Sequence, residues 1–239
     1  MFHCTLMTSA LGAAAAAASL PASAVELMLI ADDEKITWDE AGKAVFMPPG
    51  KDHVLVVDIG TDPLAPQVLA MSIRALIEPA IRGPPLINTI FGPPINLAIT
   101  PNQQLALVAK SMDQVTDNSI SVLKIAGKSV KLIDTVPMGE QVAHVAIAPG
   151  GKRAVAAKCP GHKVALLDID GKKVTRTNEV EVRGLPEGAV FSEDGKYLYV
   201  GNFLDGDVSI LSVDGDKLVD TGKRMARPGH PAAMRGRTR

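Results

Sequence analysis

The sequence predicts an all-β fold, a β-propeller of about four four-stranded blades, and three observations support this prediction. Short apolar, β-branched runs alternate with turn residues along most of the chain, as is typical of all-β proteins. Gly127, Gly171 and Gly215 are equally spaced at intervals of about 44 residues, close to the ~40–45 residues of one propeller blade. Beyond the first 24 residues, no window sustains the apolar period of a helix, with residues 71–81 as the one possible exception.

The first 24 residues are set apart by their composition. They contain no Asp, Glu, Lys or Arg, include an alanine-rich apolar stretch, and end in Ala22-Ser23-Ala24. Because this small-x-small ending suits signal peptidase, we expect residues 1–24 to be a signal peptide and the protein to be periplasmic or secreted. The stretch is shorter than the ~20 residues that a membrane span needs, so no membrane span is expected.

The N-terminal part of the mature chain resembles a blade without its first strand. Residues 27–32 and 54–58 have the pattern of a second and a third strand, whereas residues 229–234 resemble the start of a first strand with nothing after it. We therefore expect the C-terminal strand to pair into the N-terminal blade and close the ring, which would hide two sheet edges. The propeller domain would span residues 25–234, followed by a basic tail at 235–239.

Three later windows, at 97–110, 145–158 and 189–202, repeat a strand, a turn and a second strand. The second strand is almost entirely apolar, as at 105–109, which indicates burial on both faces between stacked sheets. Residues 74–94, with two Pro-Pro pairs, fit no blade and have no assigned role.

One of these windows carries a specific motif. Residues 192–202 read SEDGKYLYVGN and resemble the signature S-x-D-G-x-x-L-Y-V-x-N of the YVTN-repeat β-propeller family. Residues 29–32, 107–110 and 155–158 occupy the same place in degenerate form. The resemblance implies an exported propeller, similar to the lactonase-like and quinoprotein-like superfamilies. Family members usually carry seven blades, so a chain of about four blades is shortened; four is the lower end of the propeller range.

Candidate functional residues lie at strand ends. If the strands of each blade are lettered a to d, the b–c loops and d–a links share the face on which the central channel opens. We expect polar residues from these strand ends to surround that opening and bind a small charged ligand, with histidine titrating near neutral pH. These residues are Asp32, Asn96, Lys110, His144, Lys158, Glu187, Asn202 and His230. The alternative is that they are ordinary solvated strand ends over a water-filled channel.

No cofactor and no metal site is expected. Cys159 and His162 have the spacing of a zinc pair, but the sequence offers no second pair. The acidic turns at 32–34 and 205–207 lack the dense oxygen ligands of a calcium loop. The sequence has no nucleophile elbow, H-E-x-x-H motif or dinucleotide fingerprint. A net charge of -1 and 3% aromatic residues argue against nucleic-acid binding.

These observations favour a non-catalytic exported propeller that binds a small molecule or a protein partner on its top face. The alternative is a hydrolase or lyase that resembles the lactonase-like propellers. In that case Glu187 or His144 would be the general base, and Lys158 or His230 would stabilise developing negative charge. A third possibility is a degenerate, shortened copy without activity.

Overall fold

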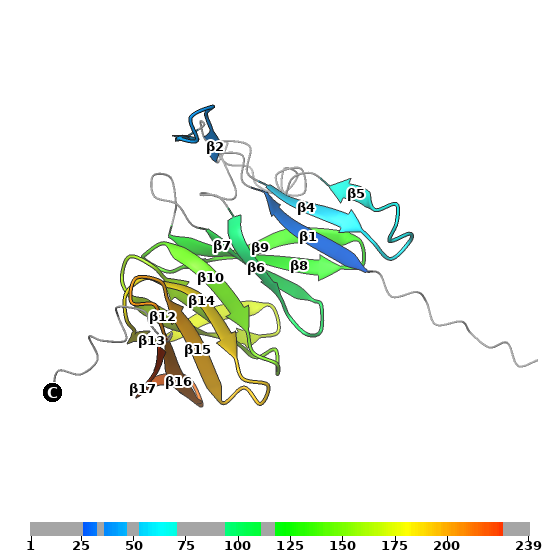
Figure 1. Cartoon of the computed structure of the whole chain (residues 1–239). Coiled ribbons are helices and arrows are strands. Elements are labelled where there is room, and N and C mark those ends of the chain that lie inside the picture. The colour runs from blue at the N-terminus through cyan, green and yellow to red at the C-terminus, as the bar shows by residue number, and fades with distance from the viewer. Residues whose placement is uncertain (1–25, 33–35, 47–52, 71–93, 111–117, 227–239) are drawn as a thin grey trace, which may run out of the picture.

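The fold is built of β-sheets alone in the part of the chain that the structure describes. The computed structural model describes residues 26–32, 36–46, 53–70, 94–110 and 118–226. Three sheets have four strands, one has three and one has two (Figure 1). The predicted all-β propeller fold is therefore confirmed, with three complete blades and the N-terminal sheet as the fourth.

The three complete blades have the same topology, with antiparallel strands that follow each other in sequence order. The first comprises β6 (Pro94–Ile99), β7 (Leu105–Lys110), β8 (Ser119–Ala126) and β9 (Ser129–Pro137). The second comprises β10 (Val142–Ile147), β11 (Arg153–Lys158), β12 (Lys163–Asp170) and β13 (Lys173–Glu181). The third comprises β14 (Pro186–Phe191), β15 (Tyr197–Asn202), β16 (Asp207–Asp214) and β17 (Lys217–Ala226).

The N-terminal sheet has the order β1-β4-β5. Its strands are β1 (Leu27–Asp32), β4 (His53–Asp58) and β5 (Gln67–Ala70). The pairing of β1 with β4 confirms the expected second and third strands of a blade. A hairpin that the sequence analysis did not predict, β2 (Ile36–Trp38) and β3 (Ala44–Phe46), lies between them in the chain.

Several expectations concern parts of the chain that the structure does not describe. The signal peptide at 1–24, the closing strand at 229–234 and the basic tail at 235–239 lie outside the described residues, as does 74–93 of the irregular segment. Pro94, the last residue of that segment, begins β6.

The equally spaced glycines form equivalent hairpin turns. Gly127, Gly171 and Gly215 have φ values of 56°, 59° and 56° and connect the third strand of a blade to the fourth. A residue with a Cβ atom is disfavoured in this left-handed region. The backbone of the turn therefore explains why glycine recurs at this interval.

Three apolar cores join the blades face to face. In β7, Ala106 and Val108 pack against the N-terminal sheet, whereas Leu105, Leu107 and Ala109 pack against the next blade. A third core joins the blade β10–β13 to the blade β14–β17. Because successive residues of a strand point to opposite faces, residues 105–109 of β7 and 154–157 of β11 are apolar and buried on both faces, as predicted, whereas β15 is buried on one face only. The first strands β6, β10 and β14 contact one another and form the inner edge of the row.

Candidate functional site

Each inner strand begins with the same β-bulge. The register against the second strand shifts by one residue, and the shifts lie between Pro94 and Asn96, Val142 and His144, and Pro186 and Gly188. Asn96, His144 and Gly188 are therefore equivalent, and Glu187 is the extra residue of its bulge, with an exposed side chain. Glu187 therefore lies one residue before the position equivalent to Asn96 and His144. Bulges of this kind re-aim side chains and are common beside active sites.

His144 is held in a defined tautomer. Its Nε2 atom lies 3.1 Å from the carbonyl oxygen of Ala189 on the next blade. Because a carbonyl can only accept, Nε2 carries the hydrogen, and a neutral ring keeps its lone pair on Nδ1. Nδ1 has no hydrogen-bond partner within the described ranges. Burial lowers the pKa of His144 below its ordinary 6.5 and outweighs the bond to Ala189, which raises it. The ring is thus neutral at pH 7, as a general base requires.

Asn96 makes the equivalent contact one blade earlier. Its Oδ1 atom accepts a hydrogen bond of 2.7 Å from the backbone N–H of Val145, the residue that follows His144. Asn96 and His144 therefore lie at the same end of neighbouring inner strands.

Lys158, by contrast, is enclosed. Its side chain is 2% exposed, its ammonium group pairs with Glu179, and it lies 3.7 Å from Oε1 of Glu140. Burial alone would raise the pKa of Glu179, but the hydrogen bond and charge of Lys158 hold it below its usual value. A cation already neutralised in this way is poorly placed to stabilise negative charge on a substrate. The sequence analysis missed both acidic partners.

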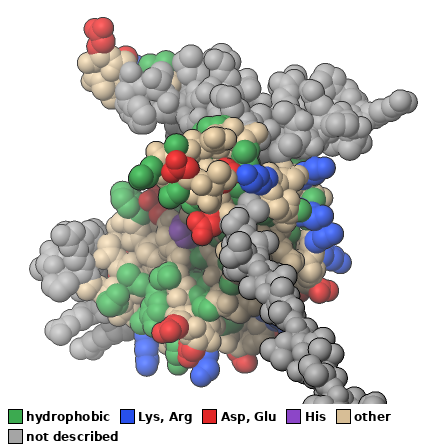
Figure 2. All heavy atoms as spheres, turned by 90° about the vertical axis from the view of Figure 1, so that its right-hand side faces the viewer, with side chains coloured by type: hydrophobic (Ala, Val, Ile, Leu, Met, Phe, Trp, Pro, Cys, Tyr) green, Lys and Arg blue, Asp and Glu red, His purple; other side chains and the backbone are tan. Residues whose placement is uncertain are grey.

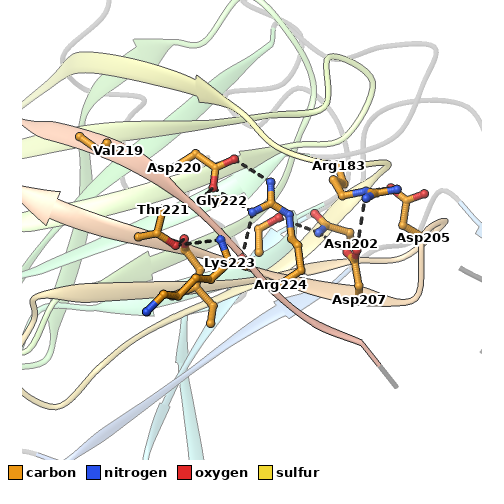
Figure 3. A network of polar contacts seen from close by, with 12 residues as sticks. Arg183, Asn202, Asp205, Asp207, Val219, Asp220, Thr221, Gly222, Lys223 and Arg224 are labelled. Carbon is orange, nitrogen blue, oxygen red and sulfur yellow. Dashed lines mark hydrogen bonds and ion pairs between the residues drawn. The ribbon is translucent and has the colours of Figure 1, made fainter. Parts of the chain in front are cut away.

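Asn202 is also enclosed, within a polar network of the last blade (Figure 3). Its amide donates to Oδ1 of Asp207 over 2.7 Å and to Oγ of Ser209 over 2.8 Å. Arg183 lies 3.2 Å from Asp205 and 3.6 Å from Asp207, and carries the network to the link before β14. Like Lys158, Asn202 ends a second strand and joins its blade to the preceding link.

The other predicted residues cannot be assessed from side-chain geometry. Asp32 and Lys110 end β1 and β7, but their side chains are outside the described set. His230 lies beyond the last described residue, Ala226.

Cys159 and His162 have structural contacts. The Cys159 thiol donates to the carbonyl oxygen of Pro186 over 3.2 Å, and burial, followed by the charge of Glu187, raises its pKa to about 11. It is therefore a protonated thiol, not a nucleophile. His162 accepts a hydrogen bond of 3.0 Å from the Leu185 N–H through Nδ1.

Two cavities lie at the opposite end of the blades. One, of about 480 Å³, is lined by Leu29, Ile99 and Gln103 among others. The other, of about 450 Å³, lies between the turns at Pro101 and Gly151. Neither is lined by a predicted site residue. Among the described residues, no group of three or more His, Cys, Asp and Glu could hold a metal ion.

Neither a family model nor a curated protein matches the sequence of this chain. A candidate 6-phosphogluconolactonase from Bacteroides uniformis superposes with a TM-score of 0.60 and 14% identity over 80% of this chain and 54% of that one. The periplasmic gluconolactonase of Pseudomonas aeruginosa superposes with a TM-score of 0.55 and 14% identity, over 80% of this chain and 53% of that one. A candidate 6-phosphogluconolactonase from Bacteroides fragilis superposes with a TM-score of 0.54 and 14% identity, over 80% of this chain and 64% of that one.

The present chain thus spans between half and two thirds of the length of these structures. At such low identity the likeness establishes the fold, a propeller-type fold. It also corrects our expectation of function. The non-catalytic binding protein that we favoured is contradicted, because three of the similar structures are named as lactonases or candidate lactonases, the class of the alternative. In the described part of the chain, no helix has the length and apolar character to cross a membrane.

Proposed function

We propose that this protein hydrolyses a small sugar-derived lactone, with His144 as the general base. One observation carries the proposal: a neutral imidazole is fixed through Nε2–H to the Ala189 carbonyl and keeps an open lone pair on Nδ1. A base oriented by a fixed acceptor on its other nitrogen is a recurrent catalytic arrangement. The fold shared with structures named as lactonases indicates the substrate class.

The reaction needs few protein groups. His144 Nδ1 would take a proton from water as the water oxygen bonds to the lactone carbonyl carbon. When the tetrahedral intermediate collapses, the ring C–O bond breaks, and the imidazolium returns its proton to the leaving alkoxide oxygen. One lactone and one water thus give one hydroxy acid, and the imidazole is regenerated. Glu187, the exposed carboxylate of the neighbouring bulge, is the second candidate base.

We also infer that the chain is an exported member of the YVTN-repeat family, with its signal peptide at 1–24, propeller domain at 25–234 and basic tail at 235–239. The turn of the signature at 192–196 supports the repeat assignment alone. Ser192 Oγ donates to Oδ1 of Asp194 over 2.6 Å, the same oxygen accepts from the Lys196 N–H, and Gly195 has φ 71°. Thr100 and Asn102 repeat the Ser192–Asp194 bond at 2.7 Å in an earlier blade.

The test is hydrolysis of gluconolactone and 6-phosphogluconolactone by the chain without residues 1–24. The rate is measured as the release of acid at constant pH, and the rate of spontaneous hydrolysis is subtracted. His144→Gln keeps an N–H donor for Ala189 but removes the base, so the rate should fall ~10²–10⁴-fold with little change in melting temperature. His162→Asn is the matched control, because asparagine tolerates the positive φ of His162 (53°) and can still accept from Leu185.

Two results would contradict the proposal. Activity of His144→Gln within a few-fold of the wild type would exclude His144 as the base, and the Glu187→Gln variant would then be measured. A wild type no faster than spontaneous hydrolysis would favour the degenerate copy without activity.

A further inference from the structure

Within the described residues, no other sheet packs on one face of the last blade. In the preceding blade, Val155 and Leu166 pair across β11 and β12 and are completely buried under the last blade. The equivalent pair in the last blade is Tyr199 and Ile210, and Tyr199 is 36% exposed. The same register position is therefore a core position in one blade and a surface position in the next.

We call this surface the trailing face and define it by four exposed residues. Val190 pairs with Tyr199, Val219 lies beside Ser212 of the same face, and Met225 pairs with Val208. Val190 is 60% exposed and Met225 59%. Figure 2 shows hydrophobic side chains gathered over the last blade, at the lower left. Contiguous exposed apolar residues of this kind mark interaction surfaces.

In the described part of the chain, the N-terminal sheet has a face outside the three apolar cores, which we call the leading face. Leu29, Val54 and Val56 point into the first interblade core. Met28, Ile30 and Val68 lie on the opposite side of the sheet. Met28 and Ile30 are 40% and 37% exposed, whereas Val57, which pairs with Met28 and Val68 on the central strand, is 4% exposed. The two sheets stand at opposite ends of the row of blades (Figure 1).

The trailing face and the leading face correspond to the two sheet faces that pack on each other between neighbouring blades of the chain. At each interblade core, the trailing side of one blade contacts the leading side of the next. A leading face on another copy would continue this packing on Tyr199 and Val190. A ring larger than one chain fits the coverage of the Bacteroides uniformis structure, because 80% of this chain superposes on only 54% of it.

We propose that two copies of this chain join head to tail, the trailing face of each packing on the leading face of the other. Two rows of four blades then close a ring of about eight, which is within the known range of propellers. Such an interface is heterologous, and the ring closes because the second contact repeats the first. This inference does not depend on the proposed lactonase activity.

The test is the molar mass of the exported chain in solution, measured by light scattering and sedimentation over a wide range of concentrations. The wild type should have twice the mass of one chain. Tyr199→Asp on the trailing face and Ile30→Asp on the leading face should each give single chains. Leu64→Asp is the control, because Leu64 is 94% exposed in the loop before β5, on neither face, and should leave the mass doubled.

Mixing the two variants distinguishes this arrangement from a symmetric contact. The Tyr199→Asp chain keeps its leading face and the Ile30→Asp chain keeps its trailing face, so an equimolar mixture should recover pairs joined by one intact contact. Circular dichroism will test whether each variant is folded. If Tyr199→Asp is unfolded, Val190→Ser takes its place, and if Ile30→Asp is unfolded, Met28→Ser takes its place. A single-chain wild type would overturn the proposal, as would a dimer sensitive to only one face or a larger open assembly.

Discussion

Asn96 and His144 occupy the same position in consecutive blades, and each bonds to the residue one place further along in the next blade. Asn96 accepts from the Val145 N–H, and His144 donates to the Ala189 carbonyl. In both of these blades, the side chain at this position links one inner strand to the next. In His144 the same contact fixes the tautomer and leaves the Nδ1 lone pair open. A structural role and the proposed catalytic role therefore fall on one residue, and experiments must separate them.

The pH dependence of hydrolysis should report His144. Because burial lowers its pKa below 6.5 and the base acts when deprotonated, kcat/KM should rise with pH to a plateau, with its midpoint below 6.5. An NMR titration of the ring should give the same value. A midpoint at or above 6.5 would contradict the assignment.

The same group should affect stability at acid pH. The unfolded chain binds the His144 proton first as pH falls below 6.5, so the free energy of unfolding should decrease between 6.5 and the lower pKa of the folded state. His144→Gln should remove this part of the slope. Unfolding by denaturant at several pH values measures both curves, and parallel curves would show that His144 titrates alike in both states.

Much of the fold could be predicted because its signals are local. The hairpin glycines and the apolar second strands each reflect a turn or a packing face within a few residues. The site was less accessible, because the bulge that displaces Glu187 leaves no mark in the apolar pattern. Lys158 was recognised at a strand end, but its partners Glu140 and Glu179 come from a link and from an outer strand. Only the tertiary structure shows that they enclose it.

Replacing Lys158 should destabilise the fold. Lys158→Met removes the buried cation beside Glu179 and Glu140. These carboxylates then keep only the more exposed Arg176 and Lys163, so we expect a loss of about 3 kcal/mol in the free energy of unfolding. Lys163, 4.0 Å from Glu140 and partly exposed, is the control, and Lys163→Met should cost below ~1 kcal/mol. Adding Glu179→Gln to Lys158→Met should restore part of the loss; equal effects of the two lysine variants would contradict this account.

Asp58 should make the contact between the N-terminal sheet and the next blade sensitive to acid. Lys128, from the β8–β9 turn, and Thr61 both donate to its carboxylate, and the pKa of Asp58 is lowered from 3.8 to about 2, first by Lys128 and then by Thr61. Its stabilisation should be complete above pH 3.8 and disappear as pH falls to about 2. Lys128→Ala should bring the pKa, followed by NMR, back towards 3.8. Lys131→Ala, in the neighbouring strand, should leave it unchanged.

Asn202 should contribute to stability, not to substrate affinity. Asn202→Leu removes both donors to Asp207 and Ser209, which are buried, and should cost about 2 kcal/mol in the free energy of unfolding. Ser209→Ala removes one of the same hydrogen bonds, so the double variant should lose less than the sum of the single losses. Denaturant unfolding of the four proteins completes this cycle, and KM for the lactone should stay within a few-fold throughout. Additive losses would show that the Asn202–Ser209 bond contributes nothing, whereas a raised KM with unchanged stability would return Asn202 to the ligand-binding residues.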